Sequence, residues 1–160
     1  APNFAPIGAI ALFAGAYLSK RYLAFLVPVL AMLFSDALMG FDGWFYMTQT
    51  ISVYAAFLLI TALGLTMQKN KSIFRVAGMS LTSSVLFFVV TNLFVWAEGF
   101  VHHPELYPLN AAGLIQCYTA AIPFFDKTLA GDVFYNAILF GGFYLLQINI
   151  PTLRQEKVKV

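Results

Sequence analysis

Long apolar runs separated by short polar breaks make up almost the whole chain. The runs cover residues 4–18, 22–40, 45–67, 74–98 and 129–150. Runs of this kind are typical of helices that cross a bilayer, which need about 20 mostly apolar residues. The pattern predicts one all-α domain over residues 1–160, a polytopic transmembrane helix bundle in which these five segments span.

The stretch 113–132 departs from this pattern. Its apolar part, residues 111–125, is 15 residues long, shorter than the ~20 needed to span. Pro123 removes a backbone donor near its end, and Asp126 and Lys127 follow directly. We therefore expect 113–125 to form a short re-entrant or lid helix packed against the bundle, because irregular backbone inside a bilayer must be covered by protein.

Composition supports a membrane protein and excludes other classes. Of the 160 residues, 61% are hydrophobic and 10% are charged, and the mean hydropathy is +0.80. Soluble domains have about 25% charged residues. The net charge of +2 and the absence of a long basic run argue against nucleic acid as a partner. The single cysteine, Cys117, cannot form an internal disulfide.

Charge placement predicts the orientation of the chain. Eight of the nine Lys and Arg residues lie at 20–21, 69–75 and 154–159, whereas six of the seven acidic residues lie elsewhere. The positive-inside rule places the three basic clusters in the cytoplasm. All three agree if 113–125 stays on the outer side, so we expect five spans and a cytoplasmic C-terminus.

Small residues dominate the first segment. Gly8, Ala11 and Gly15 give it a surface that another helix can approach closely. Packing within the chain explains this surface, and docking of another subunit is the alternative.

Several polar residues are candidates for a ligand site, each with a structural alternative. Asp36 is an acid near a helix end, where a functional role competes with simple exposure at the membrane surface. Asn92 and Trp96 lie one turn apart, and Trp96 also suits an interfacial anchor. Cys117 suits a metal or cobalt ligand, or plain packing. His102 and His103 lack further ligands that would define a metal site.

Catalytic signatures are missing from the sequence. There is no phosphate-binding P-loop, no H-E-x-x-H, no C-x-x-C and no G-x-S-x-G. We expect no enzymatic activity, no catalytic residues and no metal site, and no cofactor is indicated.

The predicted topology places a set of polar residues in the outer half of the bundle. Polar groups that converge at an apolar mouth are typical of small-molecule sites. We therefore expect one outward-facing pocket beneath the short helix, for an uncharged or cationic organic molecule. Its predicted ligand-binding residues are Asp36, Asn92, Trp96, Gln116, Cys117, Tyr118 and Asp132.

Several motifs resemble an uncharacterised bacterial integral membrane family known as domain of unknown function 6580. They are Phe4-Ala5-Pro6, ALFAGA at 11–16, Ser35-Asp36, TNLFVWAEG at 91–99, GLIQCYTAAIPFF at 113–125 and ILFGGFY at 138–144. The resemblance covers nearly the whole chain. It implies a bacterial inner-membrane protein and one further hydrophobic helix ahead of Phe4-Ala5-Pro6, which would make six spans.

Six helices with outer loops closing a pocket are also similar to the S components of energy-coupling-factor vitamin transporters. This architectural resemblance implies a substrate-binding subunit for a vitamin or cofactor molecule, with other membrane subunits as partners. The rival hypothesis is an accessory subunit that fills a place in a larger membrane complex and needs no ligand.

Overall fold

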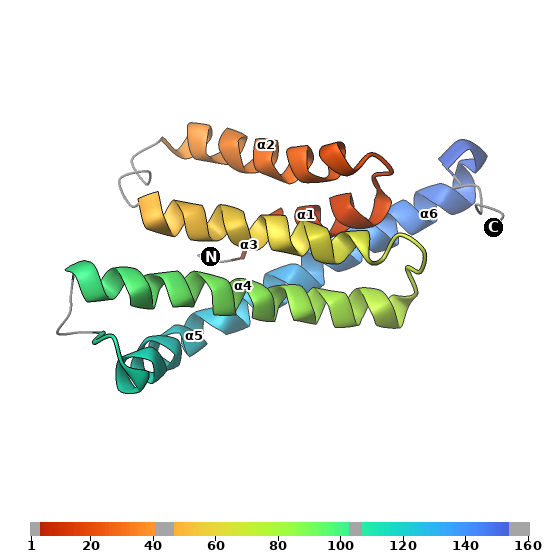
Figure 1. Cartoon of the computed structure of the whole chain (residues 1–160). Helices are drawn as coiled ribbons and strands as arrows, with labels where there is room; N and C mark the ends of the chain where they lie inside the picture. Colours follow the sequence, from red (N-terminus) through yellow and green to blue (C-terminus); the bar gives the residue numbers. More distant parts are fainter. Residues whose placement is uncertain (1–3, 41–46, 103–106, 154–160) are drawn as a thin grey trace.

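The computed structural model describes residues 4–40, 47–102 and 107–153, and the regular elements in these ranges are all helical. The helices are α1 (Ile7–Tyr17), α2 (Arg21–Met39), α3 (Met47–Leu65), α4 (Ile73–His102), α5 (Ala111–Asn136) and α6 (Gly142–Asn149) (Figure 1). A π-helical turn, η2 (Ala137–Gly141), joins α5 to α6, and a 3-10 turn, η3 (Pro151–Leu153), follows. The predicted all-α helix bundle is confirmed.

Three of the described helical stretches are long and apolar enough to cross a membrane by length and composition. They are Arg21–Leu38, Ile73–Gly99 and Ala111–Asn149, and the apolar helices Ile7–Tyr17 and Thr50–Leu65 are shorter. Large apolar side chains such as Phe34, Phe74 and Ile115 point outward. An apolar outer surface suits contact with lipid, so the structure indicates a membrane protein.

The short helix α1 lies at the centre of the bundle and packs against α2, α3, α4 and α5. Its small residues allow this central position. Gly15 meets the backbone of α3 so closely that an added Cβ would collide with the Thr61 carbonyl oxygen and lie 2.9 Å from the Gly64 Cα. Gly8, Ala11 and Gly15 are all buried, so the small-residue surface packs within the chain.

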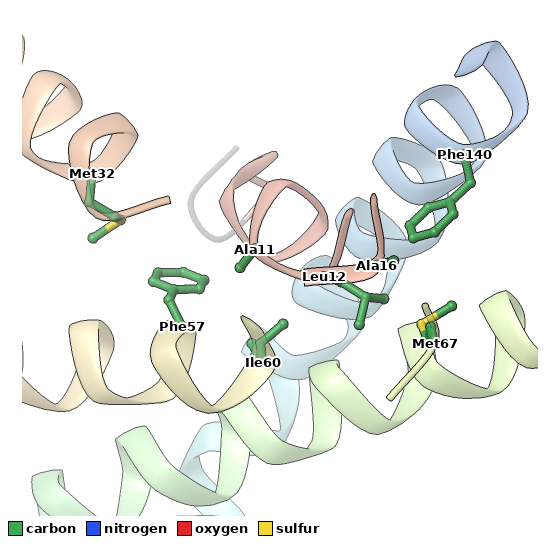
Figure 2. Close-up of a cluster of buried hydrophobic side chains, with 8 residues drawn as sticks. All are labelled: Ala11, Leu12, Ala16, Met32, Phe57, Ile60, Met67 and Phe140. Atoms are coloured by element: carbon green, nitrogen blue, oxygen red, sulfur yellow. The ribbon is translucent and has the colours of Figure 1, made fainter. Parts of the chain in front are cut away.

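The apolar core forms around the C-terminal half of α1. Figure 2 shows Leu12 and Ala16 facing Ile60 of α3 and Met67, which follows α3. Met32 of α2 and Phe140 of η2 close the cluster on either side. The core therefore joins α1, α2 and α3 to the last helical stretch, and partly buried residues of α4 such as Phe87 pack against it.

The break expected after Phe125 does not occur, and this corrects the prediction of a separate short helix. Helix α5 continues through η2 into α6, so residues 111–149 form one helical stretch of 39 residues. Asn110 starts it, because its Oδ1 accepts a hydrogen bond from the Gly113 backbone N–H at 3.0 Å. Pro123 lies inside α5 and removes one donor without ending the helix, as is common in membrane helices.

At about 1.5 Å per residue this stretch is roughly 58 Å long, nearly twice the ~30 Å hydrocarbon core. In Figure 1 it runs obliquely to α4. One continuous oblique helix thus takes the place of the short helix and the separate span that were expected.

The turn between α1 and α2 lies beside the turn between α3 and α4. Gln68 Nε2 donates to the carbonyl oxygens of Gly15 and Leu18 at 3.2 and 3.1 Å. Lys71 Nζ lies 4.9 Å from the centre of the Tyr17 ring, and burial lowers the pKa of this lysine. The basic residues at 20–21 and 69–75 therefore lie at one end of the bundle, as predicted.

Helix α6 ends at the same end, because Phe143 packs on Tyr17 with ring centroids 4.6 Å apart. The third basic cluster, 154–159, lies outside the described residues, as do Asp42 and Glu105.

Candidate functional site

Five of the buried polar side chains in the described part of the chain belong to α4 and α5. Ser80, Ser83 and Ser84 of α4 are buried, and so are Asp132 and Asn136 of α5. An acid in the interior of a membrane helix bundle is costly, and such residues usually serve a function. This group is therefore the strongest candidate site in the described part of the chain.

Four of these residues form two cross-helix hydrogen bonds, which we call the polar ladder: Ser80, Ser84, Asp132 and Asn136. Ser84 Oγ donates to Asp132 Oδ2 at 2.6 Å, and Asn136 Nδ2 donates to Ser80 Oγ at 2.9 Å. Residues four apart share one face of a helix. Because α4 and α5 run in opposite directions, the pair on one helix meets the pair on the other.

The main-chain carbonyl oxygen of Ser80 contacts two serine hydroxyls of α4. It accepts hydrogen bonds from Ser83 Oγ at 2.8 Å and from Ser84 Oγ at 3.1 Å. Because a hydroxyl has one hydrogen, the shorter contact of Ser84 with the Asp132 carboxylate dominates. Ser83 thus bonds only within α4, whereas Ser84 links the two helices.

The N-terminal end of α1 covers the ladder. A Cβ added to Gly8 would lie 2.5 Å from Asp132 Oδ1, and one added to Gly131 would lie 3.3 Å from the Phe4 Cα. The first turn of a helix carries a partial positive charge. The Asp132 carboxylate therefore lies where α1 offers it favourable electrostatics and only a glycine leaves it space.

Four of the predicted ligand residues meet at the other end of the α4–α5 contact. Cys117 Sγ donates to the Asn92 carbonyl oxygen at 3.6 Å, and Tyr118 Oη donates to the Val89 carbonyl oxygen at 2.7 Å. Trp96 Nε1 donates to the Pro108 carbonyl oxygen at 3.2 Å. Each of these side-chain donors bonds to a main-chain carbonyl oxygen. The group is therefore first of all a packing contact between helices.

The remaining predicted residues lie elsewhere. Asp36 of α2 accepts a hydrogen bond from Tyr54 Oη of α3 at 2.8 Å, and Gln116 is exposed. Asp132 is 15 residues beyond Cys117 on one helix, which is about 22 Å along its axis. The structure therefore does not bring the seven predicted residues together in one pocket, because the expected fold-back of 113–125 is absent.

The ladder contains residues that the sequence interpretation did not select. The predicted ligand residues do not include Asn136 or the serines of α4, because the prediction favours polar residues near helix ends. The sequence feature that indicates these residues is their spacing. Ser80 and Ser84 are four residues apart, and so are Asp132 and Asn136. Such spacing marks a shared helix face but does not say which faces meet.

His, Cys, Asp and Glu side chains do not form a group of metal ligands in the part of the chain that the structure describes. No set of three or more His, Cys, Asp or Glu side chains there could hold a metal ion. The side chains of His102 and His103 lie outside this part.

Comparison with known proteins gives a family but no function. No curated protein and no solved structure matches the chain, and the resemblance to S components is not confirmed. A family model described as "Family of unknown function (DUF6580)" matches residues 1–153. The chain therefore belongs to the DUF6580 family.

Proposed function

We propose that this protein binds a small organic molecule inside its helix bundle and serves as a substrate-binding subunit in membrane transport. The observation that carries the proposal is Asp132, an acid that is 4% exposed between α4 and α5. Ionisable residues in such positions usually mark substrate or ion pathways. The bound molecule is uncharged or cationic, because the site offers a carboxylate and neutral polar groups.

Binding rather than catalysis fits the neighbours of Asp132. Its hydrogen-bond partner is a serine, and the next residue of the ladder is an amide. Covalent catalysis pairs a nucleophile with a base within hydrogen-bond reach. The ladder of described residues instead supplies hydrogen bonds and one charge, which suits recognition of a small polar molecule.

We further propose a bacterial inner-membrane location with a cytoplasmic C-terminus. The basic residues at 20–21 and 69–75 lie at the end of the bundle where α6 also ends. Positively charged residues near helix ends favour the cytoplasmic side. This arrangement supports the proposed orientation.

Native mass spectrometry of protein purified in mild detergent tests the proposed function. We expect a bound organic mass with the wild-type protein and its loss in Asp132→Asn. The matched control is Asp126→Asn, which removes an exposed acid from the same helix and should keep the bound mass. Retention of the mass in Asp132→Asn, or its absence from every preparation, would contradict the proposal.

An accessory subunit without a ligand is the second candidate. It is favoured by the internal hydrogen bonds of the predicted ligand residues, since Trp96, Cys117 and Tyr118 all donate to main-chain carbonyls. The same spectra separate the two functions. Stoichiometric protein partners without a bound organic mass would identify an accessory subunit.

A further inference from the structure

One buried oxygen atom of the polar ladder lacks a hydrogen-bond donor among the described residues. Asn136 is 2% exposed, and its Nδ2 donates to Ser80 while its Oδ1 has no partner. Asp132 receives its hydrogen bond from Ser84 at Oδ2, whereas Oδ1 faces Gly8. Leaving a buried acceptor without a donor is costly. The Asn136 Oδ1 atom, next to the buried Asp132 carboxylate, therefore points to something that the ladder binds.

The ladder presents its oxygen atoms from two sides. Asp132 and Asn136 are four residues apart and share one face of α5. Ser80 and Ser84 lie opposite on α4 and are hydrogen-bonded to them. A carboxylate, an amide group and two hydroxyl groups thus share one contact between packed helices. Oxygen ligands of this kind prefer hard metal cations.

Charge decides which cation fits. The ladder contains one carboxylate, and its hydrogen-bond partner among the described residues is the uncharged Ser84 hydroxyl. Lys127 is exposed on α5, away from this buried face. A monovalent cation would balance the charge, whereas a divalent ion would leave an excess positive charge in an apolar interior.

We propose that the polar ladder binds one small monovalent metal cation, such as Na⁺, through Asp132 and the Oδ1 atom of Asn136. Ser80 and Ser84 supply further oxygen atoms. The proposal deepens the proposed function and rests on it in one respect, namely that the ladder is a binding site and not only a packing contact. Transporters likewise bind coupling ions inside their helix bundles, near the middle of the membrane.

Thermal unfolding in detergent tests this proposal at constant pH and ionic strength. N-methylglucamine chloride is replaced stepwise by NaCl, and in parallel by KCl. A bound cation stabilises the folded state by mass action, so we expect a saturable rise of about 3–6 °C in Tm. Binding of radioactive ²²Na⁺ should reach one ion per chain.

Three variants sharpen the test. Asp132→Asn and Asn136→Ala should abolish both the rise in Tm and the bound ²²Na⁺. Ser83→Ala is the matched control, since this buried serine bonds only within α4, and it should keep both. If Asp132→Asn does not fold, Asn136→Ala decides the question.

A proton on Asp132 is the competing occupant, because it also neutralises the carboxylate. Equal Tm values in all three salts, or an unchanged response in Asn136→Ala, would overturn the cation site. A cation response without a bound organic mass would uphold this site while contradicting the proposed function.

Discussion

At the scale of single residues, the glycines of α1 explain how this helix fits inside the bundle. Gly15 of α1 and Gly64 of α3 bring the two backbones into direct contact, and Gly8 makes room for the Asp132 carboxylate. Small residues at such crossings allow close packing when apolar burial gives no preference between protein and lipid. The identity of these residues is therefore set by backbone contact.

Replacing Gly15 with alanine should destabilise the protein by about 1–3 kcal/mol, because the added methyl group meets backbone atoms that cannot rotate away. Denaturation in mixed detergent micelles measures the change. Gly78→Ala is the control, since a Cβ there meets nothing within 4 Å and alanine favours the helix. Equal stability of the two variants would contradict the close α1–α3 contact.

At the scale of elements, the stretch 111–149 is the main departure from expectation. Residues 126–127 are charged and Pro123 lacks an N–H, a combination that resembles a helix end in sequence. In the structure Asp126 and Lys127 are exposed on the outer face of α5. Charged residues do not end a helix when they lie on its exposed face.

A distance measurement tests the continuity of this helix. Spin labels at Ile115 and Ile138, both exposed, are expected about 35 Å apart, since 23 residues separate them at about 1.5 Å per residue. The labels are attached to cysteines in a Cys117→Ser background and measured by pulsed electron paramagnetic resonance. Labels at Leu81 and Leu93 of α4 give a reference for a straight helix, at about 18 Å. A much shorter 115–138 distance would restore the folded-back short helix.

At the scale of the whole molecule, the bundle has a basic end and an opposite end. The turns after α1 and α3 and the end of α6 lie together, as Gln68 and Phe143 show. The connection from α4 to α5 lies at the other end of α4, where Trp96 bonds to Pro108. The helical stretches α1, α2, α3, α4 and 111–149 thus alternate in direction between these two ends.

Cysteine labelling in intact cells tests the orientation. In a Cys117→Ser background, cysteines at Ser72 and Thr152, both exposed, should resist a membrane-impermeant reagent because basic ends favour the cytoplasm. A cysteine at Asn110 should react. Labelling of Thr152→Cys together with Asn110→Cys, but not Ser72→Cys, would place the C-terminus outside and contradict a single crossing by 111–149.

The helical class, the approximate bounds of the first four helices and the shared end of two basic clusters follow from the sequence alone. These follow from local quantities. A long apolar run must satisfy its backbone groups internally in a bilayer, and a helix does so without a partner. The run 22–40, for example, needs no tertiary information to be read as α2 (Arg21–Met39).

Only the tertiary structure decided which polar residues meet. Ser84 and Asp132 are 48 residues apart, and Ser80 and Asn136 are 56 apart. In a membrane helix the lipid-facing side is as apolar as the buried side, so hydrophobic periodicity does not mark the face that packs inward. The candidate site therefore arises from the way in which α1, α4 and α5 pack, since that packing selects Asp132 and Asn136 over the polar residues nearer the helix ends.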